Sequence, residues 1–178
     1  MSHSIESPPK TIMEAYKCLP EGTLAELIDN VIYMSPSPVY KHQKTLQIIL
    51  QKLFIEIVDK NRGEVIAAPF DVYLDESANA VQPDLTVILN ENLSILDKSG
   101  HIHGVPDLLI EILSPGNKEH DLIKKKDLYE RFKVKEYWIV DPDSKLTLGY
   151  SLSKDKYQLI HEEVGHFASK LIDYEFTF

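Results

Sequence analysis

Two short segments of this 178-residue chain are apolar on both faces, and they constrain its fold more than any other feature. They are residues 106–113, PDLLIEIL, and residues 136–141, EYWIVD. Strands of this kind lie in the middle of a sheet that is covered on both sides. Between them, residues 119–132 carry Leu122, Leu128, Tyr129 and Phe132 on one side and lysines on the other, which predicts a helix packed on that sheet.

The rest of the chain supplies further elements. Apolar spacing predicts helices over residues 11–18 and 40–60. Asp29 and Asn30 separate the runs LAELI and VIYM, which indicates a hairpin. The sequence predicts neighbouring strands at residues 64–75 and 82–89. It predicts an unstructured loop at residues 90–105 and antiparallel strands within residues 145–164. We therefore expect an α/β (α+β) fold: a mixed central sheet flanked by helices, with an N-terminal hairpin and C-terminal antiparallel strands.

Length and terminal sequence bound the organisation of the chain. We expect one domain over residues 1–178, with residues 1–10, rich in Ser and Pro, forming a loose tail. No apolar stretch approaches the roughly 20 residues of a membrane span, and the N-terminus lacks the pattern of a secretory signal. These features predict a cytoplasmic protein without membrane contact. The single cysteine excludes an internal disulfide or a cysteine-based zinc site.

The charge of the chain argues against loose, sequence-independent binding to nucleic acid. Nineteen basic and 28 acidic residues give a formal net charge of −9, which repels a phosphate backbone. Residues 118–135 depart from this balance, with seven basic and four acidic residues and hence a charge of +3. A local basic patch is therefore still possible within an acidic protein.

Two acids in strand-like segments are candidates for chemistry. Glu111 lies inside the apolar run LLIEIL, where a charge is costly without a partner. Asp84 follows Pro83 and begins the run DLTVIL. Taken alone, Asp84 is also compatible with a simple turn, and Glu111 with a buried ion pair or an edge position. Together, two such carboxylates can hold Mg²⁺, which prefers oxygen ligands.

The lysine-rich helix offers a partner for these acids. Lys124, Lys125 and Lys126 cannot all point the same way, because consecutive helical residues are about 100° apart. Asp121, Lys125 and Tyr129 are spaced by four residues and share one face, with Tyr129 as the core anchor. We therefore expect Lys125 to point towards the sheet, although a solvated charged face would also explain the run.

These residues, in their order along the chain, carry a resemblance to a known family. ELIDN, VIYMSPSP, PDLTVI, LLIEILSP, the Asp121–Lys125–Tyr129 spacing and EYWIVDP resemble the Uma-two family of restriction-endonuclease-like proteins, within the PD-(D/E)XK nuclease superfamily. The resemblance covers about residues 24–142. It implies a core of mixed strands flanked by helices, with an Asp and a Glu that bind Mg²⁺ and a Lys that completes the site.

The resemblance can be carried over residue by residue. Asp84 matches the Asp of the PD element and Glu111 the following acid, while Leu113 occupies the usual place of the superfamily lysine. Lys125 on the next helix matches the lysine of this family. The resemblance also matches Glu26 in the hairpin and His42 at the start of the long helix to residues that could line the cleft. A histidine at a helix start is also commonly a cap or surface residue.

The leading hypothesis is an endonuclease that depends on Mg²⁺, with Mn²⁺ as a substitute, and hydrolyses phosphodiester bonds of DNA in preference to RNA. The alternative is a catalytically idle nuclease-like module that binds nucleic acid or a protein partner. A small-molecule hydrolase is a third possibility. Because cutting both strands of a duplex requires two active sites or two nicks, and apolar residues such as Tyr33, Leu146, Leu148 and Tyr150 follow potential sheet edges, we also expect a homodimer.

Overall fold

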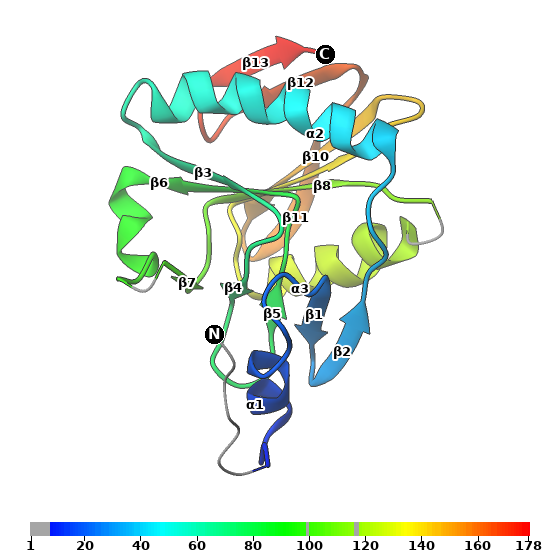
Figure 1. Cartoon of the computed structure of the whole chain (residues 1–178). Helices are drawn as coiled ribbons and strands as arrows, with labels where there is room; N and C mark the ends of the chain where they lie inside the picture. Colours follow the sequence, from blue (N-terminus) through cyan, green and yellow to red (C-terminus); the bar gives the residue numbers. More distant parts are fainter. Residues whose placement is uncertain (1–7, 99, 116–117) are drawn as a thin grey trace.

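A computed structural model describes residues 8–98, 100–115 and 118–178, and its centre is a six-stranded mixed sheet (Figure 1). The strand order is β11-β10-β9-β8-β6-β3. These strands span β3 Gly63–Ala67, β6 Leu85–Leu89, β8 Leu108–Ile112, β9 Glu136–Val140, β10 Leu146–Ser153 and β11 Lys156–Val164. The two segments that are apolar on both faces form β8 and β9, which pair in parallel, and all of their residues are buried.

Helices cover both faces of this sheet. Helix α2 (Tyr40–Leu53), continued by a π-helical turn η1 (Phe54–Val58), lies on one face. The lysine-rich helix consists of a π-helical segment η3 (His120–Lys125) and α3 (Lys126–Arg131), and it lies on the other face. The burial pattern explains this division, since Ile49 and Leu53 of α2 pack with Leu85, whereas Leu128 of α3 packs with Ile88. Alternate residues of β6 therefore face different helices.

A second sheet lies on the α3 side of the first (Figure 1). Its strand order is β2-β1-β5-β4-β7, with β1 Ala25–Ile28, β2 Val31–Met34, β4 Val72–Tyr73, β5 Ala80–Val81 and β7 Ile102–His103. The β1–β2 hairpin is the predicted one, and Asp29 and Asn30 adopt the positive φ angles of 49° and 63° that its turn requires. Helix α1 (Ile12–Lys17) packs Met13 and Tyr16 against this sheet.

The structure corrects two predictions about the middle of the chain. Residues 64–75 are not one strand, because β3 ends at Ala67, before Pro69, and β4 belongs to the second sheet. Proline has no N–H for a sheet ladder, so the chain can leave the large sheet there. Residues 90–105 are not an unstructured loop either. They form the 3₁₀ helix η2 (Asn90–Ile95) and β7, which pairs in parallel with β4.

The C-terminal strands form the predicted antiparallel meander. Strands β9, β10 and β11 pair in order, and β12 (His166–Ser169) and β13 (Tyr174–Thr177) form a ribbon that packs with α2. Gly149 on β10 faces Trp138, where an added Cβ would lie 2.6 Å from the indole ring. Only glycine leaves room for this buried side chain. Among the residues that the structure describes, no helix has the length and apolar character of a membrane span. Of the predicted tail, residues 1–7 lie outside the described residues.

Candidate active site

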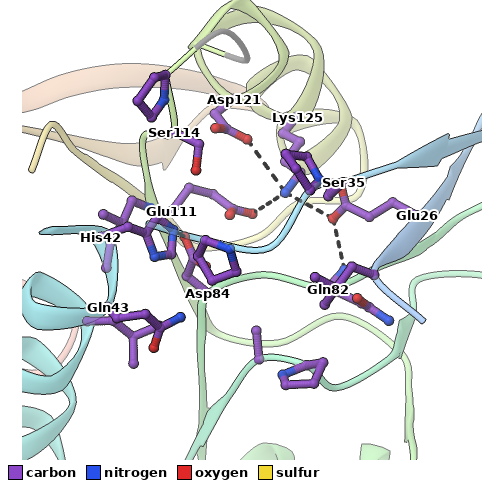
Figure 2. A pocket seen from close by; sticks show the side chains of 18 residues that line it. Glu26, Ser35, His42, Gln43, Gln82, Asp84, Glu111, Ser114, Asp121 and Lys125 are labelled. Carbon is purple, nitrogen blue, oxygen red and sulfur yellow. Dashed lines mark hydrogen bonds and ion pairs between the residues drawn. The ribbon is translucent and has the colours of Figure 1, made fainter. Parts of the chain in front are cut away.

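Asp84 and Glu111 lie opposite each other at one end of the β6–β8 pair. Leu85 pairs with Ile110 in antiparallel register, so the next step along the two strands sets Asp84 against Glu111. Figure 2 shows both carboxylates pointing into one cavity. Asp84 Oδ2 accepts a hydrogen bond from the backbone N–H of Ile112 at 2.7 Å and lies 3.0 Å from His42 Nε2. Asp84 is therefore held by the neighbouring strand and by α2, and its role goes beyond a local turn.

Lys125 reaches the same cavity from the π-helical segment η3. Its side chain is 6% exposed, and its Nζ lies 2.9 Å from Glu111 Oε1, 2.9 Å from Glu26 Oε1 and 3.6 Å from Asp121 Oδ1. Lys125 ends the π-helical segment η3, a conformation found frequently at functional sites. Lys124 and Lys126 point elsewhere, with their ammonium groups over the rings of Tyr33 and Tyr150. The structure thus places only Lys125 of the three consecutive lysines in the cavity.

Glu26 and His42 complete the set of sequence-predicted residues in this cavity. Glu26 comes from β1 in the second sheet, and its Oε1 accepts a hydrogen bond from the backbone N–H of Gln82 at 2.9 Å. His42 comes from the first turn of α2 and is buried. Its Nδ1 has no hydrogen-bond partner among the described residues. Neither residue is a surface cap, and residues of β1, α2, β8 and η3 meet in this cavity, together with Asp84 just before β6 (Figure 2).

Several further side chains belong to the site that sequence analysis did not assign to it. Asp121 is buried and lines the cavity, and its position four residues before Lys125 was the available signal. His120 Nε2 lies 3.4 Å from Glu26 Oε2, and the Tyr129 hydroxyl donates a hydrogen bond to Glu111 Oε1 at 2.9 Å. Nothing in the sequence indicates that His120 or Gln82 would approach Glu26, because more than 50 residues separate each of them from it.

The electrostatics of the site follow from three acids gathered around one ammonium group, those of Glu26, Glu111 and Asp121, with Asp84 in the same cavity. Burial raises the pKa of Glu111 well above its usual range, and it also raises the pKa of Asp121. For Glu26, burial acts in the same direction, but Lys125 and His120 outweigh it and lower its pKa to about 2. The acids around Lys125 raise its pKa well above its usual range despite its burial. Lys125 is therefore charged, Glu26 is ionised, and Glu111 tends to keep a proton.

His42 shares this electrostatic environment. Burial lowers the pKa of its imidazole, but the hydrogen bond and the negative charge of Asp84 outweigh burial and raise it. A positive His42 next to Asp84 would offset part of the negative charge of the cavity. Because the other carboxylates are nearby, the balance between these groups is sensitive to pH and to any bound cation.

The donor set of this cavity fits a hard divalent cation. Four acids, Glu26, Asp84, Glu111 and Asp121, line the cavity together with one lysine, so the oxygen donors outnumber the lysine that pairs with them. Asp84 Oδ1 and Glu111 Oε2 have no hydrogen-bond donor among the described residues, so each acid retains an oxygen for a ligand. Carboxylate oxygens are the ligands that Mg²⁺ prefers. Asp84 and Glu111 would hold such an ion.

Replacement of Lys125 by methionine tests how far the site depends on the buried ammonium. Lys125→Met leaves buried carboxylates without their cation, and we expect it to lower the free energy of unfolding at pH 7 by about 3–5 kcal/mol. Glu26, with its pKa lowered from 4.5 to about 2, contributes stability above pH 4.5 that is lost as the pH falls towards 2. The difference between wild type and variant should therefore shrink below pH 4.5.

Urea unfolding at several pH values measures this effect. Lys124→Met is the matched control, because it removes an exposed ammonium that lies over the Tyr33 ring and donates a hydrogen bond to its hydroxyl, and its cost should stay below about 1 kcal/mol. Equal unfolding free energies for the two variants at pH 7 would show that Lys125 is not the central cation of this cluster.

Comparisons with known proteins agree with this architecture. Residues 13–170 match the Uma2 family, which is described as "putative restriction endonuclease". Among curated proteins, none matches the chain. A crystal structure of a "putative nuclease belonging to DUF820" from Anabaena variabilis is similar, with a TM-score of 0.72, 19% sequence identity, and coverage of 93% of this chain and 92% of that one. That likeness shows a shared fold, restriction-endonuclease-like in class. Since the family match spans most of the sequence, this chain belongs to the Uma2 family of restriction-endonuclease-like proteins.

Proposed function

We propose that the protein is a Mg²⁺-dependent endonuclease that hydrolyses phosphodiester bonds of nucleic acid, with DNA as the substrate. The family supports a nuclease at a general level. The observation that carries the proposal further is the position of Lys125 Nζ, 2.9 Å from Glu111 in a cavity that Asp84 also lines. Two acids that can hold an ion, with a lysine beside them, form a set suited to metal-assisted phosphodiester hydrolysis.

Each residue has a distinct role in this proposal. Asp84 and Glu111 would hold the ion, and the backbone N–H of Ile112 and His42 keep Asp84 in place. The bound ion would polarise the phosphodiester and lower the pKa of the attacking water. Lys125 would orient that water or stabilise negative charge on the phosphate oxygens. Glu26, which lies as close to Lys125 as Glu111 does, would keep the ammonium in position.

The charge distribution supports a requirement for the cation. The cavity is rich in carboxylates, which repel a phosphate unless an ion lies between them. The basic stretch at residues 118–135 offers little compensation. Its Lys118, Arg131, Lys133 and Lys135 pair with Asp141, Asp29, Asp155 and Asp107. Divalent metal would therefore contribute to substrate binding as well as to chemistry.

Substitution of the three central residues tests the proposed activity. We expect Asp84→Asn, Glu111→Gln and Lys125→Ala each to reduce Mg²⁺-dependent cleavage of DNA by at least about 100-fold, because each removes a charge that acts in the transition state. Lys126→Ala is the control. Its ammonium lies over the Tyr150 ring, so this variant should change only affinity and salt dependence.

A plasmid-nicking and linearisation assay with Mg²⁺ or Mn²⁺ measures these effects, with circular dichroism to verify folding. Wild-type levels of cleavage in Asp84→Asn or Glu111→Gln would contradict the assignment of the site. Metal-dependent binding of DNA without cleavage by the wild-type protein would instead support the catalytically idle module.

The raised pKa of Glu111 predicts how Mg²⁺ binding depends on pH. A protonated carboxyl group is a poor ligand, so Mg²⁺ must displace the proton that burial favours on Glu111. Affinity should therefore increase as the pH rises from about 5 to 8, by up to about tenfold per pH unit while one proton is released. Isothermal titration calorimetry measures both affinity and proton release. An affinity independent of pH in this range would show that Mg²⁺ displaces no proton from Glu111.

We also propose that the protein forms a homodimer, with β2 as the contact edge. The four residues from which the sequence predicted a dimer are partly buried, so they do not form the exposed apolar edge that was expected: Tyr33, Leu146, Leu148 and Tyr150. Strand β2 is the outer strand of the second sheet and exposes Val31 and Met34. An edge strand with exposed apolar side chains favours pairing with another chain. Pairing there would bring together two hairpins that each carry a Glu26.

Light scattering at micromolar concentration tests the dimer. We expect a mass of twice 20.4 kDa for the wild-type protein and 20.4 kDa for Met34→Glu, which places a charge at the apolar edge. Val164→Glu is the matched control, because Val164 is equally exposed but lies on β11, at the edge of the other sheet. A wild-type mass of 20.4 kDa would exclude the dimer and leave nicking of a duplex, or cleavage of single-stranded nucleic acid, as the activity to test.

A further inference from the structure

A second group of metal-ligating side chains lies where β11 turns into β12. His161, Glu163 and His166 each present one nitrogen or carboxylate oxygen, and these three atoms lie within 4.8 Å of one another. Gly165, with a φ angle of 65°, forms the turn that brings His166 back towards β11. The two imidazole rings have centroids 5.2 Å apart. None of these residues lines the cavity of Asp84 and Glu111.

Each of the two histidines keeps a ring nitrogen that has no hydrogen bond among the described residues. His161 Nε2 lies 2.9 Å from the carbonyl oxygen of His166. A carbonyl can only accept, so Nε2 carries the proton and Nδ1 keeps its lone pair. His166 Nδ1 is buried and has no hydrogen bond among the described residues, although Glu163 Oε2 lies 3.0 Å away. On its other side, His166 Nε2 faces Glu175 Oε2 at 3.8 Å.

His161 has the usual surrounding of a metal-bound histidine. Such a histidine donates its second ring N–H to a carbonyl or carboxylate, which fixes the tautomer and the ring orientation. The carbonyl oxygen of His166 has this position for His161. His161 is also held rigidly, since it is 8% exposed and its ring packs against Trp138 at a centroid distance of 5.3 Å.

We propose that His161, Glu163 and His166 form a site for a divalent transition metal ion of the zinc class. Two imidazoles and one carboxylate suit Zn²⁺, whereas Mg²⁺ prefers a shell of oxygen ligands. Ligands of tetrahedral Zn²⁺, with bonds of about 2.0–2.1 Å, lie roughly 3.4 Å apart. The three ligand atoms lie within 4.8 Å of one another, and rotation of the exposed Glu163 side chain can bring its carboxylate to the shorter separation that zinc requires. Water would occupy the fourth position.

The location of the site indicates what the ion would do. His161 belongs to the edge strand of the six-stranded sheet, while His166 belongs to the β12–β13 ribbon that packs with α2. An ion bound to both would link the sheet edge to this ribbon and stabilise the C-terminal part of the chain. This site is independent of the proposed nuclease activity, and its test does not use that activity.

Zinc binding by tag-free protein tests the proposal. Titration with Zn²⁺ in excess Mg²⁺, which occupies oxygen-rich sites, should show one bound ion per chain and a higher unfolding temperature. We expect His166→Gln and Glu163→Gln to weaken Zn²⁺ binding at least about tenfold. Glu162→Gln is the matched control, because it removes the same charge from an exposed neighbour that is not part of the cluster.

The variants separate specific ligation from general attraction. Glu163→Gln alters an exposed side chain, so a loss of Zn²⁺ binding in this variant does not reflect misfolding. Unchanged binding in His166→Gln, equal losses in Glu162→Gln and Glu163→Gln, or the absence of Zn²⁺ binding by wild type would each overturn the proposal. The visible absorption of bound Co²⁺ provides a second readout, and bands of tetrahedral coordination should appear in wild type but not in His166→Gln.

Discussion

The buried ammonium group of Lys125 is the interaction on which the arrangement of this molecule depends. A charge inside a protein is tolerated only when it is paired, and the partners of Lys125 come from different layers. Glu111 belongs to the six-stranded sheet, Glu26 belongs to the second sheet, and Lys125 itself belongs to the helix on the face between them. The ion pairs therefore fix how the two sheets and this helix meet, and the cavity lies at that junction.

The same interaction explains why the cavity is poised for chemistry. Tyr129 and Lys125 satisfy one oxygen of Glu111, while the other oxygen remains available. One lysine cannot neutralise several carboxylates, so burial raises the pKa of Glu111 and of Asp121, whereas Lys125 and His120 lower the pKa of Glu26. A proton held on such a cluster is one that a divalent ion would displace. A bound divalent cation would therefore reduce the repulsion between the carboxylates of the cavity.

The sequence predicts those parts of the fold and site that depend on local patterns. The apolar runs of β8 and β9, the Asp29–Asn30 turn and the spacing of Lys125 each have a short-range signature. The passage of the chain from the six-stranded sheet to the second sheet after Ala67 has no such signature, because it depends on which strands lie next to β3 and β4 in space. His120 and Gln82 are likewise invisible in the sequence, since their contacts with Glu26 arise from the packing of the two sheets.

The basic stretch illustrates how tertiary structure changes the meaning of a local pattern. In the sequence, residues 118–135 form a positive segment in an acidic chain. In the fold, acids from distant segments pair with four of its basic residues, and Lys125 is buried. The ammonium groups of Lys124 and Lys126 lie over the rings of Tyr33 and Tyr150. A surface of this kind provides little long-range attraction for a polyanion, so the proposed recognition of nucleic acid relies on the cavity and on the cation that its carboxylates would bind.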